Sequence, residues 1–138
     1  MRDLADVETH LILTPAGART IIAETDRSPN EVRCLAHHVH HPRDIGASVS
    51  SGSFLAEGML VAPCSIKTLS GIAHCYNGEL LVRAAASCFF CAKPRPMPAF
   101  YHRPSGLDEI IDQTVARALD LFGVGLPTTR RWVGTDTE

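Results

Sequence analysis

The sequence predicts an α/β fold, in which the strands of one sheet alternate along the chain with covering helices. Two strand–helix junctions carry this prediction. Residues Glu8 to Thr14 have the apolar centre of a strand and run into a proline suited to the first turn of a helix. The apolar run from Met59 to Cys64 leads in the same way into Ser65. Because a globular sheet usually has about four to six strands, two secure strands predict an incomplete sheet.

Helix starts are marked by capping residues. Thr14 is a suitable N-cap before Pro15, and Ser28 and Glu31 have the spacing of a capping box. The stretch 79–90 follows an Asn-Gly turn and is also expected to be helical.

The last helix has the strongest periodicity. Apolar residues recur at i, i+3, i+4 spacing from Leu107 to Phe122. We expect Ser105 to cap this helix and Gly123 to end it. Arg117 falls at the edge of the apolar stripe, from where a guanidinium can reach over the core toward a cleft.

Composition limits the classes of protein to which the chain can belong. It has 138 residues, is 45% hydrophobic and carries a net charge of −2, which fits one soluble domain with no general attraction to nucleic acid or anionic membranes. The longest uncharged apolar stretch, 84–92, is too short to span a bilayer, and the acidic N-terminus does not resemble a signal peptide. An odd number of cysteines without secretory features is typical of reduced thiols. A cytoplasmic location is therefore expected.

Hydroxyl and ammonium groups meet at the second strand–helix junction. Ser65, Lys67 and Thr68 fall where a helix begins, and helix N-termini bind anions through unpaired N–H groups and the positive end of the dipole. Ligands of open parallel sheets bind at the carboxyl ends of strands, where this junction would lie. The residues thus predict a phosphate-bearing ligand. From spacing alone, a capped helix start with a solvated lysine is an equally good interpretation.

Metal binding is the third possibility that the side chains raise. Four histidines lie close together in the sequence: His37, His38, His40 and His41. Cys88 and Cys91 have the spacing of a zinc-binding thiolate pair, but there is only one such pair and the histidines are far from it. We expect a surface loop and two buried thiols, and no metal.

The segment from Pro63 to Ile72 resembles the P-C-S-[MI]-K-T-L-[AS]-x-I signature of the UbiX-type flavin prenyltransferases. Four other segments agree with that family in order: Glu8 to Leu11, Ser50 to Phe54, Arg83 to Ala85 and Pro98 to Pro104. The resemblance extends from about Val7 to Trp132 with one interruption. Together these motifs are highly specific.

The resemblance implies a doubly wound, flavodoxin-like parallel sheet and FMN as the cofactor. Family members transfer a dimethylallyl group from its monophosphate to N5 and C6 of reduced FMN. The product serves as the cofactor of a partner, a UbiD-type decarboxylase. The family needs no metal and forms large homo-oligomers with FMN at subunit interfaces.

Candidate site residues follow from the matching motifs. The family's S-x-K-T turn contacts FMN, and this role falls on four consecutive residues: Ser65, Ile66, Lys67 and Thr68. Thr14 occupies a strand-end position where the family commonly has a flavin-contacting serine, although it is equally well explained as an N-cap. Arg83 matches the flavin-contacting arginine of the R-A-A motif; without the resemblance it would be a surface residue of a helix.

Tyr101 and Arg117 match the tyrosine and arginine that bind dimethylallyl phosphate in the family. A phenol can hydrogen-bond the phosphate, and a guanidinium can neutralise it as it leaves. The alternative for Tyr101 is an aromatic side chain at the edge of the core.

The chain also departs from the family pattern. The G-x-[ST]-G-A phosphate loop, the L-K-E-x-R segment and the R-E-x-P strand are missing, and residues 87–96 match no family segment. We expect a single UbiX-like domain over residues 1–138 with an atypical junction at 87–96, poorly ordered or exposed. A non-catalytic or unstable remnant with weak flavin binding is therefore the alternative to an active enzyme.

Overall fold

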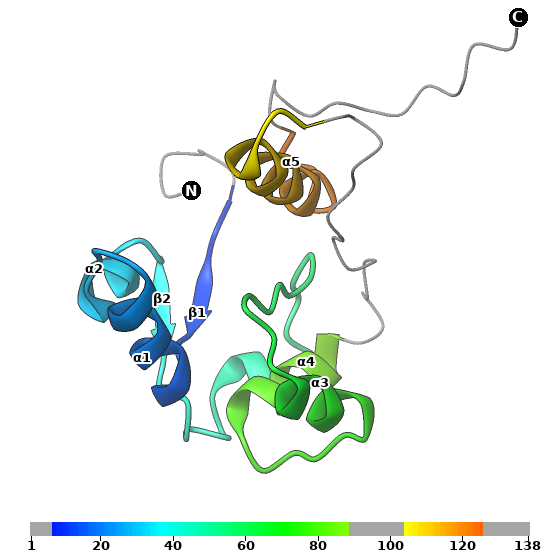
Figure 1. The fold of residues 1–138 in the computed structure, drawn as a ribbon. Helices are drawn as coiled ribbons and strands as arrows, with labels where there is room; N and C mark the ends of the chain where they lie inside the picture. The colour runs from blue at the N-terminus through cyan, green and yellow to red at the C-terminus, as the bar shows by residue number, and fades with distance from the viewer. Residues whose placement is uncertain (1–6, 89–103, 126–138) are drawn as a thin grey trace, which may run out of the picture. The chain divides into compact units, whose positions relative to one another are not determined.

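The computed structural model describes residues 7–88 and 104–125 (Figure 1). The chain divides into two units, residues 1–90 and 91–138, and each is considered by itself. The first unit contains β1 (His10–Ile12), α1 (Pro15–Glu24), α2 (Pro29–Cys34), β2 (His38–His40), the 3-10 turn η1 (Ser48–Ser50), α3 (Ile66–Ala73) and α4 (Leu80–Ser87). The second unit contains α5 (Leu107–Asp120).

A two-stranded parallel sheet is the centre of the first unit. β1 pairs with β2 so that His10 lies opposite His38 and Ile12 lies opposite His40. Side chains alternate between the two faces of a sheet, so these four residues share one face. Within the described ranges no further strand joins this sheet. The α/β class is confirmed, and the described sheet is small, although its second strand is not the one that the sequence predicted.

Strand prediction succeeded for one segment and failed for two. The expected strand at Glu8 to Thr14 is confirmed as the shorter β1. The expected strand at Met59 to Cys64 is wrong, because no described strand lies beside it to provide ladder hydrogen bonds. The surface loop expected around the four histidines is also wrong in part, since His38 and His40 belong to β2. Three mostly polar residues carry almost no strand signal, and tertiary pairing with β1 forms β2.

Capping residues predicted the helix starts of the first unit correctly. Thr14 caps α1, with Pro15 in the first turn. Ser28 and Glu31 form the expected capping box of α2. The helix expected over 79–90 is confirmed for Leu80–Ser87, which form α4, and residues 89 and 90 lie outside the described part of the chain.

The core of the first unit joins α4 to β1. Leu80 is completely buried and clusters with Val49 and Ala84, and Ile12 and Phe54 pack against this cluster. The burial of these apolar groups fixes the start of α4 beside the sheet.

Close packing joins α3 to α4. A Cβ on Gly71 of α3 would lie 3.3 Å from Cγ2 of Val82. Only glycine allows this approach without displacing Val82, so the two helices form one compact pair.

The second unit is described only for residues 104–125. Gly123 has a left-handed φ of 74° and ends α5 as expected. The expected Ser105 cap is wrong: Gly106 is the N-cap residue and offers no side chain. Instead, the backbone N–H and the hydroxyl of Ser105 both donate to Oε2 of Glu109, at 2.8 Å each. Glu109 thus binds the chain that precedes the helix.

Two further expectations fall at the edges of the described residues. Ser87 ends α4 and Cys88 is half-buried, whereas residues 89–96 of the junction, including Cys91, lie outside the described residues. Among the helices that the structure describes, none is long and apolar enough to cross a membrane.

Candidate functional site

A pocket of about 510 Å³ lies at the carboxyl ends of the two strands. It is lined by Thr14, Pro15, Pro42, Arg43, Ile45, Gly78 and Glu79. The carboxyl ends of strands are where ligands of open α/β sheets bind, and the volume is in the usual range for a small-molecule site. The loops after β1 and β2 and the start of α4 therefore form one concave site.

Thr14 connects β1 to α1 at the pocket wall. Its Oγ1 accepts a hydrogen bond from the backbone N–H of Gly17 at 3.0 Å. A threonine hydroxyl that accepts one bond still has its own hydrogen to donate. The N-cap explanation of Thr14 is therefore confirmed, and it leaves the hydroxyl able to bind a ligand in the pocket.

Arg43 is the pocket's cation and was not predicted from the sequence. It follows β2 through Pro42, and its guanidinium makes no ion pair with any residue that the structure describes. A guanidinium presents a planar set of donors that matches phosphate. Recognition of β2 was the missing signal, because Pro42 and Arg43 follow its carboxyl end after one intervening residue, His41.

The start of α3 has the predicted capping arrangement. Ser65 Oγ accepts from the backbone N–H of Thr68 at 3.1 Å and lies 3.0 Å from Thr68 Oγ1. Ile66 is 86% exposed, so this turn faces solvent in a single chain. The structure thus shows an accessible helix N-terminus with two hydroxyl groups.

Lys67 connects the start of α3 to the pocket. Its Nζ lies 3.3 Å from Oε1 of Glu79, which is one of the lining residues. Both side chains are largely exposed, so their pairing contributes little to stability. Lys67 therefore neutralises a carboxylate that would otherwise repel an anion, and an anionic ligand can draw the ammonium away at little cost.

The remaining predicted residues lie elsewhere or outside the described part of the chain. Arg83 is exposed on α4 and does not line the pocket. Arg117 is half-buried on α5, in the second unit. Tyr101 is outside the described residues. The structure therefore brings Thr14 and, through Glu79, Lys67 to one pocket.

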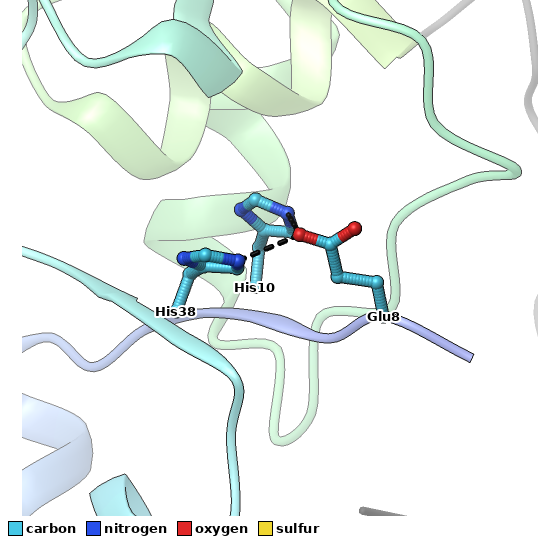
Figure 2. Close-up of side chains that lie close together, drawn as sticks. All are labelled: Glu8, His10 and His38. Atoms are coloured by element: carbon cyan, nitrogen blue, oxygen red, sulfur yellow. Dashed lines mark ion pairs between the residues drawn. The ribbon is translucent and has the colours of Figure 1, made fainter. Parts of the chain in front are cut away.

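A second polar cluster gathers on the shared face of β1 and β2. Figure 2 shows the carboxylate of Glu8 pointing toward the rings of His10 and His38. Glu8 Oε1 lies 3.5 Å from Nε2 of His10 and 2.6 Å from Nε2 of His38. Partial burial lowers the pKa of His10, and the neighbouring imidazoles of His38 and His40 lower it further, outweighing the opposite effect of Glu8. His10 is therefore held in its neutral form to lower pH than an ordinary histidine.

These features define an α/β protein with an open pocket at its strand ends and nearby cations suited to a phosphate. No protein-family model matches the chain. Among curated proteins, it is 43% identical to the flavin prenyltransferase UbiX of Escherichia coli K12, over 97% of this chain and 87% of that protein. It is 40% identical to a probable UbiX-like flavin prenyltransferase of Streptomyces sp. strain D7, over 97% of this chain and 82% of that protein. The chain belongs to the UbiX flavin prenyltransferase family.

Solved structures agree with this assignment. AnUbiX (PadA1), crystallised with FMN and dimethylallyl pyrophosphate, is 36% identical and superposes with a TM-score of 0.81, over 94% of this chain and 85% of that one. A dodecameric FMN-dependent UbiX-like decarboxylase from E. coli O157:H7 is 37% identical with a TM-score of 0.83. The match covers 96% of this chain and 88% of that one. The flavodoxin-like fold expected from the sequence motifs is confirmed by these neighbours.

The alignment with E. coli K12 UbiX also shows a gap. It extends over 165 residues, more than the 138 residues of this chain. Part of the relative within the aligned span therefore has no counterpart here, in agreement with the interruption that the motifs predicted.

Proposed function

We propose that this chain is a flavin prenyltransferase that binds FMN and transfers a dimethylallyl group to its reduced form. The observation that carries the proposal is the 43% identity to a flavin prenyltransferase over nearly the whole chain. The pocket at the carboxyl ends of β1 and β2 supports it independently. The dimethylallyl donor is a phosphate ester, as in the ligand of AnUbiX.

The residues of the first unit fit FMN. The pocket lining combines apolar residues with the Thr14 hydroxyl and the Arg43 guanidinium, which suit a phosphate and the polar edge of a flavin. The capped start of α3 adds backbone N–H groups and the Lys67 ammonium beside Glu79. We assign FMN contacts to Thr14, to residues 65–68 and, by the family motif, to Arg83.

Positioning and charge neutralisation are the chain's part in the reaction. When bound, reduced FMN supplies the nucleophilic atoms that accept the dimethylallyl group. Arg43 and Lys67 offset the negative charge of bound phosphate, and the pocket walls restrict water and align the reactants. Tyr101 and Arg117 are proposed to bind the phosphate of the donor, the first by hydrogen bonding and the second by charge.

A recipient protein, a location and an oligomeric state complete the proposed function. We propose that the product is passed to a UbiD-type decarboxylase in the cytoplasm, which rests on the family resemblance. Homo-oligomer formation is supported by the dodecameric relative and by large apolar side chains that a single chain leaves exposed, including Leu55 at 95%. A second copy would cover such groups.

Turnover tests this function directly. Incubation of the purified chain with reduced FMN and dimethylallyl phosphate should give prenylated FMN, detected by mass. Arg43→Ala should lose most product, whereas Arg19→Ala, an exposed arginine of α1 away from the pocket, should keep it. FMN binding without product would favour the non-catalytic remnant, which the close relatives do not favour. Failure to bind FMN at all would contradict the proposed pocket.

A further inference from the structure

We propose that Glu8, His10 and His38 form a binding site for a divalent transition-metal ion of borderline softness, for which Zn²⁺ is the best match. The three residues offer one carboxylate oxygen and two imidazole nitrogens, and these three atoms lie within 4.8 Å of one another (Figure 2). Two histidines and one glutamate are a ligand set that zinc uses when a fourth position stays open.

Strand pairing creates this convergence. Glu8 and His10 are two residues apart along the first strand segment, and the parallel register places His38 directly opposite His10. His10 and His38 therefore share one face of the sheet, and Glu8, just before β1, directs its carboxylate to both rings. The site therefore joins chain segments about 28 residues apart, and sequence spacing alone gave no sign of it.

Distances between the ligand atoms are close to what a metal ion needs. Tetrahedral zinc ligands at their usual bond lengths lie about 3.3 Å apart. Glu8 Oε1 and His10 Nε2 are already 3.5 Å apart, and Glu8 Oε1 and His38 Nε2, at 2.6 Å, must separate slightly. The rings of His10 and His38 are stacked, 4.6 Å between centroids and 23° between planes, so the His38 ring must rotate for both nitrogens to face one ion. The Glu8 and His38 side chains are 64% and 53% exposed, which leaves room for this rotation. An ion can also enter from solvent, and water can occupy the remaining position.

His40 supplies the outer support that metal-bound histidines usually have. His40 Nε2 lies 2.9 Å from His10 Nδ1. When His10 donates its Nδ1 hydrogen to His40, its Nε2 lone pair faces Glu8 and is available to a metal. The rings of His10 and His40 are also stacked, 5.2 Å between centroids, and Phe54 packs edge-on against His10. His10 is therefore the oriented ligand of the three.

The metal site is separate from the flavin pocket. Glu8 precedes β1 and His10 begins it, whereas the pocket opens at the carboxyl ends of β1 and β2, and the two sets of residues do not overlap. The proposal therefore does not depend on flavin prenyltransferase activity. Its physical consequence is a cross-link between the two strands of a small sheet, which stabilises the folded state because an unfolded chain does not hold the ligands together.

Calorimetric titration of the full chain with ZnCl₂, after treatment with EDTA and its removal, tests the site. We expect one Zn²⁺ per chain, with binding weakened about tenfold or more by Glu8→Gln and by His38→Gln. His41→Gln is the matched control, because His41 lies just beyond β2 and outside the cluster, and it should leave the affinity unchanged. Co²⁺ should give the absorption bands of a four-coordinate site in the wild type but not in Glu8→Gln.

Thermal melting provides a second readout that does not require activity. Saturating Zn²⁺ should raise the melting temperature of the wild type and of His41→Gln, but not that of Glu8→Gln. FMN affinity should be the same in Glu8→Gln and in the wild type, which also shows that the variant is folded. Absence of stoichiometric binding, or an equal loss in His41→Gln and Glu8→Gln, would overturn the proposal and leave Glu8 as an ordinary hydrogen-bond partner of two histidines.

Discussion

The starts of α1 and α3 are built alike but lie in different surroundings. Each begins with a side-chain hydroxyl that accepts a backbone N–H bond, Thr14 from Gly17 at 3.0 Å and Ser65 from Thr68 at 3.1 Å. α1 follows a strand and lines the pocket. α3 follows an irregular segment, and no residue of its first turn lines the pocket.

A capped helix N-terminus becomes part of a concave site only where neighbouring segments surround it. β2 provides those neighbours for α1, because it brings Pro42 and Arg43 to the same edge of the sheet. The α3 start is open in a single chain, with Ile66 86% exposed. In the homo-oligomer proposed above, a second copy of the chain would cover it. We therefore infer that α1 is the anchor of the flavin site and that α3 completes it on assembly.

Removal of the core side chain that holds the pocket wall should have the largest effect. Leu80 is completely buried and fixes the start of α4, next to Gly78 and Glu79 of the pocket. Leu80→Ala should destabilise the protein by about 2–5 kcal/mol because it leaves a cavity. Chemical denaturation measures this loss. Arg19→Ala, at an exposed arginine of α1, is the control and should change stability by less than about 0.5 kcal/mol. Equal effects would mean that the core does not support the pocket.

Loss of either helix cap should lower protein stability equally, but the two losses should differ in their effect on FMN affinity. Thr14→Ala and Ser65→Ala should each cost about 1 kcal/mol, since each removes one capping hydrogen bond. At protein concentrations low enough to keep the chain monomeric, Thr14→Ala should weaken FMN binding more than Ser65→Ala. Denaturation and flavin fluorescence give the two values. A greater binding loss in Ser65→Ala under these conditions would reverse the proposed roles of α1 and α3.

Lys67 should give the smallest effect. Its ammonium is 88% exposed and, among the described residues, forms an ion pair with Glu79 alone, so Lys67→Ala should leave the melting temperature within a few degrees. FMN affinity should fall by a few-fold in the assembled protein, because one positive charge near the phosphate is lost. Glu79→Gln removes the negative charge that pairs with Lys67 and should not weaken FMN binding. Unchanged FMN affinity in Lys67→Ala at every protein concentration would remove the α3 start from the site.

Local chemistry explains which parts of the structure the sequence could predict. The caps at Thr14, Ser28 and Ser65 are short-range hydrogen bonds, so residue identity and spacing suffice to find them. Strands depend on partners distant in the sequence. The polar segment His38–His40 pairs with β1 and was missed, whereas the apolar segment Met59 to Cys64 has no described partner and is not a strand.

The candidate site shows the same limit. The family motifs indicated Thr14 and residues 65–68. These residues could be found because capping hydroxyl groups at a helix start are recognisable from local sequence. Arg43 could not be found because its position at the pocket depends on β2. The cluster of Glu8, His10 and His38 depends on the same pairing. Arg83 on α4, Arg117 on α5 and the undescribed Tyr101 keep the roles that the motifs assign to them as predictions.

Binding of FMN and riboflavin by Arg43→Ala tests most directly whether the pocket at the strand ends holds the flavin phosphate. The two ligands differ by that phosphate, and a hydrogen-bonded charge contributes about 1.5–3 kcal/mol, or about tenfold or more in affinity. The wild type and Arg19→Ala should prefer FMN to riboflavin, and Arg43→Ala should lose most of that preference while its riboflavin affinity stays unchanged. If Arg43→Ala kept the wild-type preference for FMN over riboflavin, the flavin phosphate would not bind in the pocket beside Arg43.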